Sequence, residues 1–380
     1  MRNVRNAANH TSSMGLPEAS AFSLANSQLA SRGATIGGRM SRAILHVLES
    51  SNPDAGSVAV CLRGLHEALA TRGLRSKAVA PPADATRALQ GVDVVHIHGW
   101  GYGLAHRIAA QAFRAGKPYA MSPLGTLTFG PHNKRTWKDR LGAAWRTRRL
   151  VRGAACVTAI NPPEEHDLKS RRLHSCISVL PYGVSFDEYA GALTGDAVQT
   201  NGNRCLLLLG PLHPRGGCVA LLKAIAEIGP DANGWNMVLA GSDDGQWRKL
   251  LESAVRRKKS EDRVAFADAT TVARQRTLLS RASLLVSPGL HIGLSVSIMQ
   301  AVASEVPVLA STCTAPPGFG DAISVCGPRR EELREALRSV LKLPDGSLRA
   351  MGEKARALGR AMFDWSVLAD QYAQLYKSIA

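Results

Sequence analysis

The chain has 380 residues, of which 45% are hydrophobic, which suits globular α/β domains and excludes a largely disordered protein. Its formal net charge of +17 favours anionic partners, namely phosphates, acidic lipid headgroups or nucleic acid, without choosing among them. The seven cysteines are scattered and form no Cys-x-x-Cys pair, which argues against a disulfide framework or a zinc site and for a reducing compartment.

The first forty residues show no strand or helix pattern. Residues 1–40 are rich in Ala, Ser and Asn and lack the continuous apolar core of a signal peptide, so we expect a disordered tail. No run of about eighteen apolar residues occurs, and we therefore predict no membrane span. These features together predict a cytoplasmic protein.

Strand and helix patterns alternate between residues 41 and 180. The apolar run 43–48 is typical of a buried strand, and the spacing of apolar residues over 58–69 predicts an amphipathic helix. Further elements are expected as strands at 77–80, 92–98 and 118–122, and as a helix at 104–115. This alternation predicts a parallel sheet with helices on both faces, as in a Rossmann-like domain.

The alternation begins again after Pro181-Tyr182-Gly183, which we interpret as a hinge. Strands are expected at 204–210, 237–241, 264–267, 282–286 and 307–310, and helices at 218–228, 246–258, 271–280 and 297–304. A second Rossmann-like domain is thus expected over 181–362, followed by a terminal helix over 363–380. Open parallel sheets bind ligands at the carboxyl ends of their strands, so the cleft between the two domains is the expected site.

Four stretches of the second half resemble the retaining glycosyltransferases of family 4, the group 1 glycosyltransferases. Residues 180–186 are similar to the interdomain Pro-x-Gly-Val-Asp-x-x-Phe segment of that family, and residues 209–217 to its Gly-Arg-Leu-His-Pro-x-Lys-Gly loop. Residues 238–241 match the strand before the base-binding region, and residues 280–310 resemble the long donor-site signature. The order and spacing of these motifs carry the resemblance.

Weaker matches occur in the first half and at the carboxyl end. Residues 94–99 resemble the strand of the family that ends in His, and residues 121–127 resemble its Ser-Pro-His-Gly-x-Leu stretch. Residues 363–366 resemble the start of the final helix, which in this family crosses back onto the N-terminal domain. The resemblance implies the GT-B fold, with two Rossmann-like domains facing each other across a cleft, the N-terminal one (41–180) for the acceptor and the C-terminal one (181–362) for the nucleotide sugar.

The chemistry implied by the resemblance is metal-independent transfer of a sugar from a nucleotide-diphosphate donor, with retention of configuration and without a cofactor. The negative charge that grows on the departing diphosphate must then be met by Arg or Lys and by backbone N–H groups at a helix start. The family supplies an Arg and a Lys from the loop after the first strand of the C-terminal domain. It also supplies two glutamates eight residues apart, one at the reacting sugar and one at the ribose hydroxyls.

This sequence departs from the family at five polar positions. Pro211 and Gly216 stand where the family has the loop Arg and Lys, and Ile292 and Gln300 stand where it has the two glutamates. Leu124 replaces the histidine of the Ser-Pro-His stretch. Of these five residues, only Gln300 keeps a hydrogen-bonding side chain, which can still donate to and accept from ribose hydroxyls.

Neighbouring residues are the candidates for binding the donor. Arg215 lies beside the lost Lys position, and Gly216-Gly217 directly precede the helix expected at 218–228, a geometry suited to a phosphate nest. Gln300 is the candidate ribose ligand. Gly56 lies in the first loop, where the family often has glycines near the donor phosphate.

Histidines are the candidate catalytic residues. His98 ends a strand whose carboxyl end should face the cleft, and His291 stands beside Ile292, near the reacting sugar of the family. His96 is expected to lie on the opposite face of its strand and to be structural. No metal site is predicted.

The segment 134–152 holds eight basic residues and one acidic residue. Trp137, Leu141 and Trp145 are spaced four residues apart and would share one helical face. That face either packs on its own domain or docks on acidic lipid at the inner face of the cell membrane, where a lipid-linked acceptor would lie. Packing and docking use the same residues, so both interpretations stay open.

Three functions are compatible with these observations. The first is a transferase that uses a nucleotide-sugar donor and a polysaccharide or lipid-linked acceptor. The second is a catalytically inactive relative that acts as a binding or partner subunit, which the replaced charges favour. The third, nucleic-acid binding, has only the net charge in its support, because no helix-turn-helix, zinc-finger or RNA-binding signature is present. We therefore expect a transferase and no nucleic-acid partner.

Overall fold

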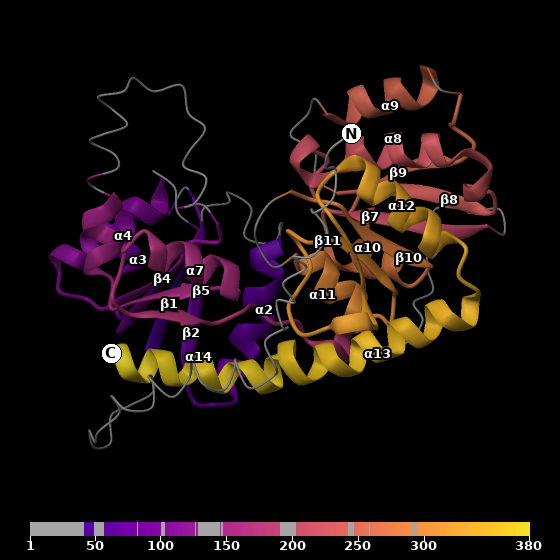
Figure 1. Ribbon diagram of the computed structural model, residues 1–380. Coiled ribbons are helices and arrows are strands. Elements are labelled where there is room, and N and C mark those ends of the chain that lie inside the picture. The colour runs from indigo at the N-terminus through magenta and orange to yellow at the C-terminus, as the bar shows by residue number, and fades with distance from the viewer. Residues whose placement is uncertain are drawn as a thin grey trace, which may run out of the picture.

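The computed structural model describes residues 42–48, 57–81, 83–99, 103–125, 127, 145, 147–190, 203–241, 247–257, 259–290 and 295–380. These residues form two parallel six-stranded sheets, one in each half of the chain. In Figure 1 the two sheets and their helices stand side by side, and the last two helices run beneath both. The expected fold class is confirmed.

The N-terminal sheet has the strand order β2-β1-β3-β4-β5-β6. Its strands are β1 (Ala43–Leu48), β2 (Arg75–Val79), β3 (Val94–His98), β4 (Tyr119–Ser122), β5 (Cys156–Ala159) and β6 (Ile177–Val179). Its helices are α2 (Ser57–Ala70), α3 (Ala85–Ala88), α4 (Leu104–Arg114) and α7 (Pro162–Ser170). The start of α7 is fixed by Asn161, whose side chain accepts from the Glu164 N–H, and by a proline at the first helical position.

The C-terminal sheet has the strand order β12-β11-β10-β7-β8-β9. Its strands are β7 (Arg204–Leu209), β8 (Trp235–Ala240), β9 (Val264–Ala267), β10 (Leu284–Ser287), β11 (Val308–Ser311) and β12 (Ser324–Cys326). Its helices are α8 (Cys218–Ile228), α9 (Trp247–Arg257), α10 (Val272–Leu279), α11 (Val296–Ala303), α12 (Arg330–Leu341) and α13 (Asp345–Phe363). Short 3-10 turns occur at η1 (Phe186–Tyr189), η2 (Pro214–Gly216), η3 (Gly229–Ala232) and η4 (Gly320–Ala322).

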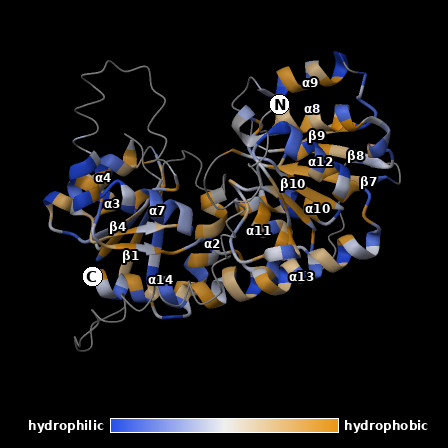
Figure 2. Ribbon diagram, in the orientation of Figure 1, coloured by the Kyte–Doolittle hydropathy of each residue, from blue (hydrophilic) through white to orange (hydrophobic). Residues whose placement is uncertain are grey.

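Continuous apolar strands explain why both sheets are covered on two faces. β7 reads Arg-Cys-Leu-Leu-Leu-Leu, and its last five residues are buried. A strand without polar alternation must bury both faces, as parallel sheets flanked by helices do. Figure 2 shows the strands β7 and β10 in the hydrophobic colours, whereas the helices around them carry hydrophilic stretches.

The last helix joins the two halves. α14 (Trp365–Ile379) packs against α2 of the N-terminal half, and α13 packs against α11 of the C-terminal half. The backbone of Val184 accepts from Trp365 and donates to the carbonyl of Phe363, so the hinge segment is bonded to the junction of α13 and α14. One hydrophobic cluster consequently contains residues of both sheets and of α2, α11 and α14.

Candidate active site

The loop after β7 is shaped by glycines. Gly217 has φ of +82° and forms the N-cap of α8, a left-handed conformation that glycine adopts without strain. A Cβ at this position would lie 2.6 Å from the carbonyl oxygen of Pro288, which follows β10. A Cβ on Gly241, after β8, would collide with the carbonyl of Gly210. The loops at the carboxyl ends of β7, β8 and β10 therefore lie in backbone contact.

The amide groups of the two predicted glycines are used inside this loop. The Gly216 N–H donates to the carbonyl of His213 at 2.8 Å, and the Gly217 N–H donates to that of Pro214 at 3.0 Å. The helix bonds begin with Leu221, whose N–H donates to the Gly217 carbonyl. The first N–H groups of a helix lack partners within it, so the amides of 218–220 are the ones in this loop that could bind an anion.

The cation predicted for this loop is only partly described. The backbone of Arg215 belongs to η2, whereas its side chain lies outside the described residues. The ring of His213 meets Trp247, at the start of α9, edge to face with 5.5 Å between centroids. This ring contact joins the loop after β7 to the start of α9.

Gln300 is buried in α11, with 2% of its surface exposed. Its amide nitrogen donates to the Tyr189 hydroxyl at 2.8 Å and to the Gln275 side-chain oxygen at 2.7 Å. Both N–H bonds of that amide are therefore occupied. Only its side-chain oxygen, Oε1, could therefore bind a ribose hydroxyl, and this role of Gln300 stays a prediction.

Two predicted site residues, Gly56 and His291, lie outside the described residues, as does Ile292. Their roles stay predictions. Leu124, which the sequence analysis placed at the histidine position of the family, follows β4 with φ of +56°. The next residue, Gly125, donates its N–H at 2.6 Å to the carboxylate of Glu164, which also accepts from the Ile160 N–H.

Glu164 is a buried acidic group that the sequence did not single out. Burial raises its pKa, while the two backbone hydrogen bonds act in the opposite direction. It ties the loop after β4 to the start of α7. Its position three residues after an Asn that precedes two prolines was the available signal, because an N-cap residue is commonly followed by Glu at the third helical position.

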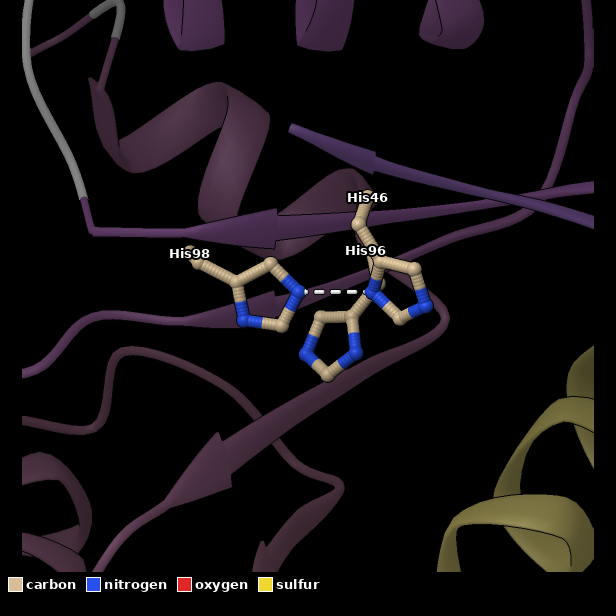
Figure 3. Close-up of side chains that lie close together, drawn as sticks. All are labelled: His46, His96 and His98. Atoms are coloured by element: carbon tan, nitrogen blue, oxygen red, sulfur yellow. Dashed lines mark hydrogen bonds between the residues drawn. The ribbon is translucent and has the colours of Figure 1, made fainter. Parts of the chain in front are cut away.

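Three histidines meet beneath the carboxyl edge of the N-terminal sheet (Figure 3). His98 is 2% exposed; its Nε2 lies 2.9 Å from Nδ1 of His46 and its Nδ1 lies 2.5 Å from the Tyr182 hydroxyl. His96 is bonded through Nδ1 to the hydroxyl of Tyr376 and through Nε2 to that of Ser122. In this conformation His98 presents almost no surface to a substrate, and its catalytic role stays a prediction.

The expectation that His96 points away from His98 is wrong. The two ring centroids are 4.1 Å apart, because residues two positions apart on a strand share a face. His46 joins them since it lies directly opposite His96 in the parallel register of β1 and β3. The sequence contained this signal in the alternate histidines 96 and 98 and in a third histidine near the middle of the first strand.

Burial makes this cluster neutral. Loss of solvation lowers the pKa of His46 to about 3 and holds the pKa values of His96 and His98 well below their ordinary value. Nε2 of His46 finds no partner among the described residues. The favoured tautomer therefore has His46 Nδ1–H donating to His98, since the alternative would bury an unbonded N–H.

Neutral imidazoles are also metal ligands. Each of the three residues offers one ring nitrogen within 4.8 Å of the others. Five of the six ring nitrogens, however, already bond to protein groups, three of which are hydroxyls. An ion would have to replace these bonds.

Comparison with known families identifies both halves of the chain. Residues 203–342 match the model described as glycosyl transferases group 1, and residues 63–183 match the glycosyl transferase 4-like domain. The chain belongs to the group 1 glycosyltransferases. This family assignment agrees with the motifs at 180–186 and 280–310.

Relatives of this glycosyltransferase are distant in sequence. One is the GDP-mannose:cellobiosyl-diphosphopolyprenol alpha-mannosyltransferase of Komagataeibacter xylinus, 25% identical over 190 residues. That match covers 48% of this chain and 48% of the relative, so it spans about half of the relative's length.

Solved structures share the GT-B fold with this glycosyltransferase. Sucrose-phosphate synthase of Thermosynechococcus elongatus has a TM-score of 0.72 at 20% identity, covering 88% of this chain and 98% of that one. HepE of Anabaena, solved with UDP and glucose, has a TM-score of 0.67 at 15% identity, covering 89% of this chain and 100% of that one. At these identities the likeness concerns the fold.

The two halves of this glycosyltransferase meet through α2 and α11, each of which follows a strand of its own sheet. Arg63 of α2 lies 3.6 Å from Glu188 of η1, and Tyr189 of the same turn reaches Gln300 in α11. Gly64 lies so close to the ring of Trp365 that no Cβ would fit. The turn η1, which follows the hinge segment, therefore contacts both α2 of the N-terminal half and α11 of the C-terminal half.

The basic segment 134–152 is described only at residue 145 and from 147 onward. Trp145 is 63% exposed, and the Arg149 guanidinium lies 5.8 Å from its ring centroid. Trp137 and Leu141 lie outside the described residues. Among the described helices, none combines the length and the hydropathy needed to cross a bilayer.

Proposed function

We propose that this chain transfers a sugar from a nucleotide-diphosphate donor to a polysaccharide or lipid-linked acceptor, without a metal and with retention of configuration. The observation that carries the proposal is the glycine-shaped start of α8, where Gly217 lies against Pro288 at the carboxyl edge of the sheet. A helix start in this place is suited to a diphosphate. Membership of the group 1 glycosyltransferases supports the reaction class.

The donor would lie across the carboxyl ends of β7 and β10 and beside α11. Its diphosphate would accept from the amides of 218–220 and from Arg215, and a ribose hydroxyl would donate to the carbonyl oxygen of Gln300. These contacts favour departure of the diphosphate because positive and N–H groups oppose its growing charge. His291 is the candidate group nearest the reacting sugar. His98, which is buried, would be a positioning residue that acts through its hydrogen-bonded neighbours.

The inference about the class of acceptor rests on a relative that is distant in sequence. The Komagataeibacter enzyme is named for a cellobiosyl-diphosphopolyprenol acceptor, and HepE was solved with UDP and glucose. We infer a carbohydrate acceptor, free or lipid-linked, and a UDP or GDP donor. Contact of the segment 134–152 with acidic lipid would bring such an acceptor to the enzyme.

The test has a binding and a turnover measurement. UDP and GDP are expected to raise the melting temperature, because a ligand that binds only the folded state stabilises it. Purified protein, mixed with UDP- or GDP-sugars and with a cell extract that contains lipid-linked or free carbohydrate acceptors, should release UDP or GDP in the presence of EDTA. Arg215→Ala should weaken both effects, whereas Arg257→Ala on α9 should change neither. Absence of any nucleotide effect on melting, with no release from common donors, would refute the proposal.

A second function is favoured by Ile292 and Gln300, which replace the glutamates of the family. In that case the chain is an inactive partner subunit. The environment of Gln300 accommodates a carboxylate, since Tyr189 and a reoriented Gln275 amide can both donate to it. Nucleotide binding without turnover in the natural protein, together with turnover in the doubly substituted Ile292→Glu, Gln300→Glu protein, would establish this alternative.

A further inference from the structure

A groove of about 830 Å³ lies between α8 and α9, within the range of small-molecule sites. Its walls are the facing sides of the two helices, and its floor is β8 with Trp235 and Met237. In Figure 1 both helices lie on the side of the C-terminal sheet away from α13 and α14. The groove borders the candidate donor site, since Val219 near the start of α8 and Trp247 at the start of α9 both line it.

The walls of the groove are apolar and incompletely packed. Ala226 of α8 and Ala254 of α9 are small, which leaves the space between the helices open. Leu250 of α9 borders this space and is 56% exposed. An exposed leucine beside an open apolar groove is the surface that a hydrocarbon would cover favourably.

The charges around the groove are mainly positive. Lys223, Arg257 and Arg263 line it, and Glu227 is its one acidic residue. The carboxylate of Glu227 is already paired with Arg330 at 2.9 Å and with Arg334 at 3.5 Å. The basic side chains would therefore attract an anionic head group at the rim and repel a cationic one.

We propose that the groove between α8 and α9 binds the hydrocarbon chain of an anionic lipid, with the head group at the basic rim. The occupant is one lipid molecule with a long unbranched chain, rather than a bilayer surface. This site does not depend on the transferase reaction, and its failure would leave the proposed function untouched.

The direct test uses tryptophan fluorescence. Trp235 and Trp247 both line the groove, so palmitate carrying bromine near the middle of its chain should quench their emission. Hexadecyltrimethylammonium, with the same chain length and the opposite charge, should not compete for the site. Each removal of two methylenes from the fatty acid should weaken binding by up to about 15-fold, if those groups are fully buried.

Matched variants locate the site. Ala254→Leu adds three carbons between the two helices, so it should narrow the groove and weaken quenching by palmitate without lowering the melting temperature. Arg257→Glu should weaken palmitate binding at least tenfold, whereas Lys249→Glu, the same change of charge on an exposed residue of α9 outside the groove, should not. Equal binding of the cationic amphiphile, or palmitate binding that is unchanged by both Ala254→Leu and Arg257→Glu, would overturn the proposal.

Discussion

The buried histidine cluster makes the stability of the N-terminal half depend on mild acid. An unfolded histidine takes up a proton near pH 6.5, whereas burial lowers the pKa of His46 to about 3 and those of His96 and His98 well below normal. Between these values the unfolded chain binds more protons than the folded one, so stability falls as pH falls. Above pH 6.5 both states are neutral and the penalty vanishes.

The magnitude follows from the same linkage. Each histidine costs about 1.4 kcal/mol per pH unit below its unfolded pKa. From pH 7.5 to pH 5.5, three such residues remove about 4 kcal/mol, a large part of the roughly 5–15 kcal/mol of a folded domain.

Urea unfolding at half-unit pH steps, with EDTA present to remove any bound metal, measures the slope. His46→Gln should reduce the decline between pH 7.5 and 5.5 by about a third, because one of three buried titrating groups is lost. His166→Gln, the same substitution on an exposed residue of α7, is the matched control with which the slope of His46→Gln is compared. A free energy of unfolding that stays flat across this range would refute the argument that burial keeps the cluster neutral.

Three further changes test the site and its support. Gly217→Ala places a methyl group 2.6 Å from the Pro288 carbonyl in a left-handed residue, a conformation that costs about 1–2 kcal/mol, so nucleotide-induced stabilisation should be lost in a thermal-shift assay. Gln300→Leu leaves the Tyr189 hydroxyl without its partner and should lower stability by about 1–3 kcal/mol in chemical denaturation. Gly64→Val collides with the Trp365 ring and should loosen α14, seen as faster proteolysis near the carboxyl end than in the natural protein.

Periodic apolar patterns were sufficient to predict most of the fold. The strand at 43–48 and that at 264–267 have the predicted bounds, and the helix predicted at 271–280 is observed at Val272–Leu279. β5, β6 and β12 were missed. β6 and β12 have three residues each, and β5, which reads Cys-Val-Thr-Ala, contains only one large aliphatic side chain. Such runs do not stand out from the surrounding chain as buried strands.

The candidate site was less predictable than the fold, since contacts between distant segments decide it. Glycines at 216 and 217 pointed to the start of α8, yet the sequence could not show that their own N–H groups would bond within the turn. The histidine cluster needs the register of β1 against β3, which pairs His46 with His96. Apolar strands fix their position by packing along their whole length, and such a register cannot be derived from one strand alone.

Glycines and charged side chains at the candidate donor site constrain function to different degrees. A charged side chain can be replaced by a neighbour, such as Arg215 for a lysine one position away, because long side chains reach the same point from different backbone atoms. Gly217 and Gly241 have no such freedom, since any Cβ would meet the backbone of a neighbouring loop. A chain that had lost all use for this edge would be free to relax these loops apart and to accept larger residues there. The tight loop geometry therefore favours a site still shaped for a ligand over a scaffold retained only for stability.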